Sequence, residues 1–267
     1  MNILVIGGGN MGKTLAQSIL QSNIVSAEEL FIFEKDEDKV VELNNEQLGT
    51  AFSTVDQHFE KADLLILAVK PQDAALLFPT IAPFIQSNKI ILSIMAGIKI
   101  NDIKKATGAT KIVRAMPNLP SQVGKGTTGY FFSKEMNEED KSIIQRILNS
   151  IGISIEVKEE DKIDAITAIS GSGPAYVYYF MDAMIQAAIQ LGFNKEDAFK
   201  LVSQTFEGSI QLLKENELSC QEWIQRVSSK GGTTEAALSV FDQSNVKNLI
   251  GKGVLRAENR SKELSKT

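Results

Sequence analysis

The sequence predicts an α/β protein whose N-terminal part is built on a parallel sheet and whose C-terminal part is entirely helical. Up to about residue 158, short apolar runs alternate with helical patterns, which is typical of βαβ units. From Glu159 onward only helical periodicity remains. The 267 residues also exceed the common size of one domain, about 100–150 residues. We therefore expect two domains, residues 1–160 and residues 161–267.

The N-terminal half contains apolar runs of strand length that are bounded by turn residues. A helix is expected after Asn137, because asparagine caps helices well and apolar residues recur at helical spacing from Ile143 to Ile151. The runs predict strands over Asn2–Ile6, Leu30–Glu34, Asp63–Val69, Lys89–Met95, Thr110–Met116, Thr127–Phe132 and Ile153–Val157.

The C-terminal half shows helical periodicity throughout. The stretch Ala175–Phe193 is the most apolar part of the chain, but Asp182, Gln186 and Gln190 place a polar stripe along it. We interpret it as a buried helix of a water-soluble domain and expect no membrane partner. Helices are predicted over Asp161–Ile169, Pro174–Leu191, Lys195–Lys214, Gln221–Val227, Thr233–Phe241 and Val246–Leu264.

Composition narrows the class of protein further. The net charge of −5 offers no cationic field for the phosphates of a nucleic acid, so nucleic acid is not an expected partner. The single cysteine, Cys220, cannot form an intramolecular disulfide, and no export signal precedes the first apolar run. These features predict a reducing, cytoplasmic location.

A glycine-rich motif follows the first predicted strand. Gly7, Gly9 and Gly12 form G-x-G-x-x-G, with Asn10 and Met11 inside it and a helix pattern after it. Glycines let the backbone approach a pyrophosphate, and the free N–H groups of the helix start bind the anion. In this context the motif predicts a Rossmann domain that binds NAD(P)(H).

Glu34 ends the second predicted strand, at the distance from the glycines where such domains carry an acid that binds the ribose. A carboxylate there accepts hydrogen bonds from ribose hydroxyls and repels a 2′-phosphate, so Glu34 favours NADH. The alternative is that Glu34 opens a solvated run of charges toward the next helix. Lys35, its neighbour, could also recruit a phosphate.

Two further turns follow predicted strands at the edge of the sheet where ligands of open α/β sheets collect. Ala68 lies near the end of the buried third predicted strand, and Lys70 and Pro71 follow it. Lys70 is suited to meet phosphate or ribose, unless it is a solvated loop lysine. Asn118 ends the segment Arg-Ala-Met-Pro-Asn and either binds near the nicotinamide or stabilises its own turn.

Three segments behind the glycine motif carry a family resemblance. Arg-Ala-Met-Pro-Asn ending at Asn118, Ser-Gly-Ser-Gly-Pro-Ala-Tyr starting at Ser170, and Ser-Ser-Lys-Gly-Gly-Thr-Thr ending at Thr234 occur in this order. Together with the glycine motif they resemble pyrroline-5-carboxylate reductases over nearly the whole chain. The resemblance implies reduction of 1-pyrroline-5-carboxylate to L-proline by NAD(P)H, the last step of proline synthesis. It also implies a homodimer, alone or within a larger homo-oligomer.

The resemblance further implies roles for individual residues. The substrate carboxylate would be bound by Ser229, Gly232, Thr233 and Thr234. A Gly-Gly turn at the start of a helix presents free N–H groups to an anion, which agrees with this role. The alternative is that these residues only cap the helix. Thr167 would contact the ring nitrogen. Ser172 lies before Pro174, where an exposed helix start would face the reacting end of the ligand or the nicotinamide, unless the segment is only a hinge between the domains. Lys230 stands where many relatives have proline.

The sequence lacks the residues that several other classes of enzyme would need. The only histidine, His58, has no nucleophile or metal-ligand spacing around it, so no metal is expected. A β-hydroxyacid dehydrogenase shares the two-domain plan, but its catalytic lysine would belong in Pro174–Leu191, which contains no lysine. A protein that senses NAD(P) without turnover is the remaining alternative, because fold does not establish function.

Overall fold

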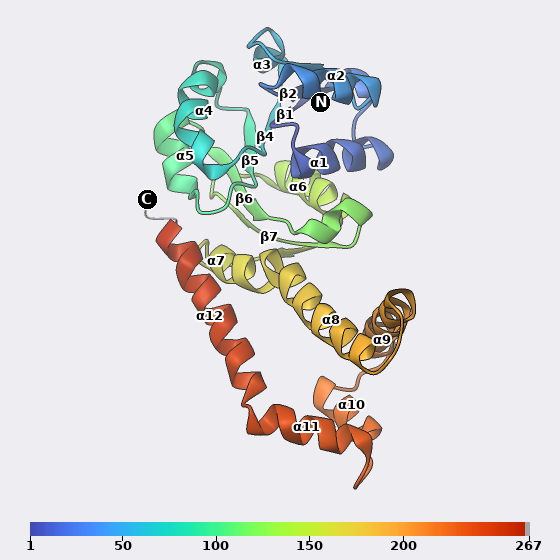
Figure 1. The fold of residues 1–267 in the computed structure, drawn as a ribbon. Coiled ribbons are helices and arrows are strands. Elements are labelled where there is room, and N and C mark those ends of the chain that lie inside the picture. The colour runs from blue at the N-terminus through green and yellow to red at the C-terminus, as the bar shows by residue number, and fades with distance from the viewer. Residues whose placement is uncertain (265–267) are drawn as a thin grey trace. The chain divides into compact units, whose positions relative to one another are not determined.

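The computed structural model describes residues 1–264 (Figure 1). Its contacts divide the chain into two compact units. The first unit is Met1–Ser172 together with the segment that begins at Ala257, and the second is Gly173–Arg256. The first unit contains a sheet covered by helices, and the second is helical, so the predicted fold class is confirmed.

The sheet of the first unit has eight strands in the order β3-β2-β1-β4-β5-β6-β7-β8. The sheet is parallel, as expected, except at one pair, because β6 and β7 are antiparallel. The connection between them holds only the short helix η4 (Leu119–Val123), and a parallel crossover needs a dozen residues or more. The strands are β1 (Ile3–Ile6), β2 (Leu30–Phe33), β3 (Thr50–Phe52), β4 (Leu64–Leu67), β5 (Ile90–Ser93), β6 (Lys111–Met116), β7 (Gly126–Phe132) and β8 (Gly152–Glu156).

Seven of these strands match the predicted runs, with ends that differ by at most two residues. The edge strand β3 was not predicted. It has only three residues and pairs with β2 through Ala51 and its two neighbours. A run so short carries no period-2 pattern by which it could be recognised.

Each face of the central strands packs into its own apolar core, because side chains alternate along a strand. In β1, Ile3 and Val5 join the core under α1 (Asn10–Gln21), α2 (Glu37–Asn45) and α6 (Glu138–Ser150). Leu4 and Ile6 join the core on the other face, under α3 (His58–Lys61), α4 (Ala74–Ile81) and α5 (Ile100–Thr107). Helices therefore cover both faces of the sheet (Figure 1).

The predicted helix start at Asn137 is confirmed. The side chain of Asn137 caps α6 by accepting a hydrogen bond of 2.8 Å from the Asp140 amide. The other one-turn helices of the first unit are η1 (Ala27–Glu29), η2 (Pro71–Asp73) and η3 (Ala82–Phe84).

The predicted helix over Asp161–Ile169 divides into α7 (Lys162–Ile166) and a π-helical turn, η5 (Thr167–Gly171). The Ser172 amide donates to the Thr167 carbonyl at 2.8 Å, five residues back, and Ser172 itself has right-handed helical angles. The expectation of an open helix start before Pro174 is therefore wrong, since helical backbone already precedes that proline. π-turns inside helices are frequent at functional sites.

The second unit contains the predicted helices in their predicted order, and no strand occurs within Gly173–Arg256. The expectation that the apolar helix Ala175–Phe193 is buried is not met in the single chain, because no residue of α8 is buried. Within residues 1–264, no helix is both long and apolar enough to span a bilayer. The helices are α8 (Gly173–Gln190), α9 (Lys195–Glu215), α10 (Cys220–Val227), α11 (Thr233–Gln243) and α12 (Val246–Leu264), whose last residues belong to the first unit.

Candidate active site

The glycine motif lies between β1 and α1, as predicted. Gly9 is the residue before the first helical turn, which Asn10, Met11 and Gly12 form. The N–H groups of a first turn have no acceptor within their own helix, and this turn contains no acidic side chain. The start of α1 is therefore suited to bind a phosphate.

Close packing explains two of the three motif glycines, and the third faces open space. Gly7 has a φ of +108°, and a Cβ there would lie 2.9 Å from the Ala68 carbonyl carbon. A Cβ on Gly12 would overlap the Gly7 carbonyl oxygen. A Cβ on Gly9 would meet no protein atom within 4 Å, so Gly9 leaves room for a ligand. The loop fits the pyrophosphate of a dinucleotide.

Glu34 follows β2 and is buried, at 8% exposure, so it does not open a solvated run of charges. One carboxylate oxygen accepts the Gly8 amide at 2.8 Å, and the other accepts the Asp36 amide at 3.1 Å. Glu34 thereby connects the end of β2 to the glycine loop. The charged run begins at Asp36, which caps α2 by accepting the Asp38 amide.

A cleft of about 370 Å³ opens beside the glycine loop and brings together half of the predicted cofactor residues. Lys70 is exposed at its edge and directly precedes Pro71, the first residue of η2. Lys35 also lines the cleft, with Nζ 3.8 Å from a carboxylate oxygen of Asp73. The predicted residues that line the cleft are Gly7, Gly9, Glu34, Ala68 and Lys70.

The four residues predicted to bind a carboxylate lie on one turn at the start of α11. The Gly232 amide donates to the Ser229 carbonyl at 2.9 Å, and a Cβ on Gly232 would lie 2.5 Å from the Ser229 hydroxyl. Gly232 precedes the first helical turn, so Thr233 and Thr234 are its first two residues. The Glu235 carboxylate accepts the Gly231 amide at 2.6 Å. The turn gathers two threonine hydroxyls and the N–H groups of a helix start.

The two predicted catalytic hydroxyls lie at opposite ends of η5. The Thr167 hydroxyl donates to the Ile163 carbonyl at 2.8 Å, which leaves its lone pairs for another donor. Asn118, predicted to bind the cofactor, lies outside the cleft. Its Nδ2 donates to the Ser170 carbonyl at 3.0 Å and its Oδ1 accepts the Thr127 amide at 2.8 Å. Asn118 thus stabilises its turn and the π-turn together.

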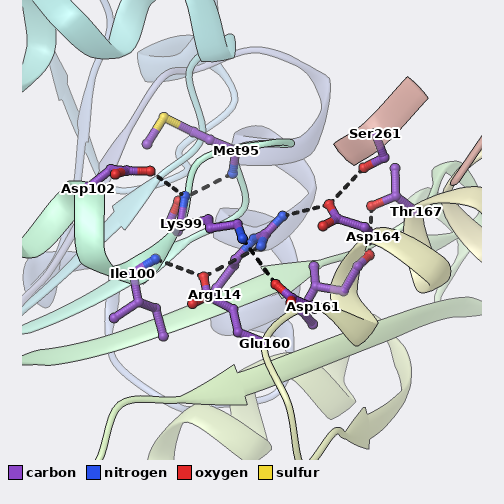
Figure 2. A network of polar contacts seen from close by, with 12 residues as sticks. Met95, Lys99, Ile100, Asp102, Arg114, Glu160, Asp161, Asp164, Thr167 and Ser261 are labelled. Atoms are coloured by element: carbon purple, nitrogen blue, oxygen red, sulfur yellow. Dashed lines mark hydrogen bonds and ion pairs between the residues drawn. The ribbon is translucent and has the colours of Figure 1, made fainter. Parts of the chain in front are cut away.

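A buried ionic network beside η5 did not emerge from sequence reasoning (Figure 2). Arg114 of β6 is 1% exposed, and its guanidinium binds Asp164 at 3.1 Å and Glu160 at 3.4 Å. Asp164 also accepts the Ser261 hydroxyl of α12 at 2.8 Å. The one sequence signal for this network is a charged residue in the middle of an apolar strand.

The network extends to the start of α5 through two contacts (Figure 2). The Glu160 carboxylate accepts the Ile100 amide at 2.8 Å. Lys99 lies 3.0 Å from Asp161. This hydrogen bond lowers the pKa of Asp161 below its ordinary value and raises the pKa of Lys99.

His58 contacts Asp56 through Nδ1 at 2.9 Å and packs against Phe31 and Phe52. Within residues 1–264, no group of three or more histidine, cysteine, aspartate or glutamate side chains could hold a metal ion.

Comparisons with known proteins agree with this geometry. Residues 160–264 match the family model for pyrroline-5-carboxylate reductase dimerisation, and residues 2–97 match the model for NADP oxidoreductase, coenzyme F420-dependent. Pyrroline-5-carboxylate reductase 2 of Bacillus subtilis is 33% identical, over 97% of this chain and 93% of its own.

Solved structures with related sequences include two reductases. The NADP-bound pyrroline carboxylate reductase of Plasmodium falciparum has a TM-score of 0.90 at 32% identity, with 99% and 98% of the two chains covered. The pyrroline-5-carboxylate reductase of Coxiella burnetii has a TM-score of 0.91 at 35% identity, with 100% and 99% covered. This chain therefore belongs to the pyrroline-5-carboxylate reductase family.

Proposed function

We propose that this protein is an NAD(P)H-dependent oxidoreductase that reduces 1-pyrroline-5-carboxylate to L-proline. The main support for the proposal is the similarity of the whole chain to known reductases. The chain also has both the cleft proposed for the dinucleotide and the turn at the start of α11. Distant relatives with other chemistry, such as a ketol-acid reductoisomerase at 15% identity, share the fold alone. A β-hydroxyacid dehydrogenase remains disfavoured because α8 contains no lysine.

The substrate needs little acid–base help, because the carbon of a protonated cyclic imine is already electrophilic. The dinucleotide supplies the hydride, and the chain binds and orients the two reactants. We assign binding of the cofactor to Glu34 and to the loop and cleft residues around it. Asn118 is assigned to the support of that site. The substrate carboxylate is assigned to the turn of Ser229, Gly232, Thr233 and Thr234, and the ring nitrogen to Thr167. Ser172 is assigned to the reacting end of the ligand.

The purified protein should oxidise NADH or NADPH in the presence of pyrroline-5-carboxylate, and proline should accumulate in equal amount. A 2-keto acid in place of the imine should give no turnover, because a neutral ketone carbon is less electrophilic than the carbon of a protonated imine. Absorbance at the reduced nicotinamide band and amino-acid analysis measure both products. Dinucleotide binding without any oxidation would instead support a sensing protein.

We further propose that the enzyme prefers NADH, because the buried Glu34 carboxylate lines the cleft and would repel a 2′-phosphate. Glu34→Ser should shift the ratio of kcat/KM values toward NADPH. The change also removes the acceptor of the Gly8 amide, so Glu34→Gln, which keeps an acceptor oxygen without the charge, is the matched variant. A wild type that favours NADPH tenfold would contradict the preference, and Lys35 would then be the candidate phosphate ligand.

The second unit supports the proposal of a homodimer, alone or within a larger assembly. Within Gly173–Arg256 only two hydrophobic residues, Ala198 and Val202, are buried, although many apolar side chains line its helices. Large exposed apolar surfaces usually mark protein interfaces. The match of residues 160–264 to a dimerisation model agrees with this, and it also supports a functional boundary near residues 160 and 161.

Tyr179→Asp should dissociate the dimer, because Tyr179 lies in an apolar groove with Phe180 and Leu249, and a charge buried there would lack a partner. Val41→Asp is the control: Val41 is an exposed apolar residue of α2 in the first unit. Light scattering at micromolar concentration measures the mass of both variants. An active, monomeric wild type would contradict the dimer.

The cytoplasm is the proposed compartment, to be tested by fractionation of cells.

A further inference from the structure

The guanidinium of Arg114 binds two carboxylates that belong to different local structures. Asp164 lies inside α7, one helical turn before Thr167, and its side chain is 2% exposed. Glu160 precedes α7, is 20% exposed and accepts the Ile100 amide at the start of α5. The two anions share one cation, but only Asp164 lies on the helix that continues into the π-turn.

Three contacts fasten the segment from α7 to η5 onto β6, β7 and the loop between them. Arg114 of β6 binds Asp164 at its beginning (Figure 2). Ile166 packs into a notch at Gly129 of β7, where any Cβ would overlap its side chain. Asn118 donates to the Ser170 carbonyl at its end. The segment from α7 to η5 is thus held at both ends by the same hairpin.

We propose that Arg114 is a positioning residue for the reaction, acting through Asp164 to fix the orientation of the π-turn and of the Thr167 hydroxyl. The proposal rests on the proposed function, which assigns that hydroxyl to the ring nitrogen. A helix accommodates the extra residue of a π-turn at a cost in stability, so its geometry depends on the contacts around it. A displacement of a positioned group by about 1 Å is enough to lower a rate about a hundredfold.

The two anions of Arg114 provide a matched test of positioning against general stabilisation. Asp164→Asn and Glu160→Gln each remove one negative charge from the same guanidinium and keep the side-chain shape. For Asp164→Asn we expect kcat to fall at least about tenfold, with the KM for the dinucleotide within twofold of the wild type. For Glu160→Gln we expect kcat to stay within about twofold. Asp164→Glu, which restores the charge, should recover part of the lost rate.

A second readout needs no substrate. The Ser172 amide closes the π-turn by its bond to Thr167, and amide hydrogen exchange at Ser172 reports that bond. Exchange should accelerate in Asp164→Asn and stay unchanged in Glu160→Gln, whereas the helix α1 should exchange equally in both. If Asp164→Asn does not yield folded protein, Ser261→Ala takes its place, because it removes one hydrogen bond to the same carboxylate.

All kinetic measurements are made well below the melting temperature of each variant. Equal losses of kcat in the Asp164 and Glu160 variants, or an unchanged Ser172 exchange rate in Asp164→Asn, would overturn the positioning role. A wild type that does not reduce pyrroline-5-carboxylate would contradict the proposed function instead, and the exchange experiment would still decide whether Asp164 orders the π-turn.

Discussion

A Gly9→Ala variant is expected to lose affinity for the dinucleotide while keeping the stability of the wild type. The backbone at Gly9, with φ −70° and ψ −176°, is accessible to alanine, and its Cβ would meet no protein atom within 4 Å. The methyl group would therefore occupy the space proposed for the pyrophosphate. We expect the KM values for NADH and NADPH to rise at least about tenfold, or ~1.4 kcal/mol. Steady-state kinetics and a thermal melt measure both effects.

Gly12→Ala is the contrasting variant in the same loop. Its Cβ would overlap the Gly7 carbonyl oxygen, so the backbone of the loop must shift and the melting temperature should fall. Gly9→Ala should show no such fall. An unchanged KM for both dinucleotides in Gly9→Ala would remove the assignment of this loop to the pyrophosphate.

Thr234→Ala is expected to lower kcat/KM for pyrroline-5-carboxylate about tenfold to a hundredfold, because a hydrogen bond to a charged group is worth roughly 1.5–3 kcal/mol. The KM for the dinucleotide should barely move. Thr234 is the second residue of α11 and Gly232 occupies the cap position, so the hydroxyl of Thr234 is not the cap of this helix. Measured KM values for both reactants test the assignment.

Thr205→Ala provides the control for loss of a threonine hydroxyl in the second unit. Thr205 lies on α9 and its hydroxyl donates to the Leu201 carbonyl of its own helix. Both KM values should stay at the wild-type level there. If Thr234→Ala instead lowers only the thermal stability, by about 1 kcal/mol, its hydroxyl has a purely structural role in the first turn of α11 and the carboxylate lies elsewhere.

The fold was largely predictable because its main elements are long enough to show their periods. Helices such as α9, with 21 residues, carry several turns of pattern, and the central strands are continuous apolar runs. The direction of β7 was not predictable from its own residues. It depends on the five residues of η4, which allow a hairpin and exclude a crossover.

The site was predictable where function resides in one short segment. The glycine loop and the α11 turn each gather their residues within a few positions of the chain, so the sequence alone indicates both. The partners of Arg114 lie 46 and 50 residues away, and no local pattern connects them. The hydrogen bond that the Gly8 amide donates to Glu34 was not predicted for the same reason, although both residues belong to recognised motifs.

The bond between Asp164 and Ser261 also determines when the first unit can be completed during synthesis. Its two residues are 97 positions apart, and the whole of Gly173–Arg256 lies between them. A ribosome that adds about 5–20 residues per second needs roughly 5–20 s to cover that interval. Throughout it, the carboxylate of Asp164 has no access to the hydroxyl of Ser261. This contact forms only once α12 has left the exit tunnel, so the first unit is completed after the whole second unit has been made.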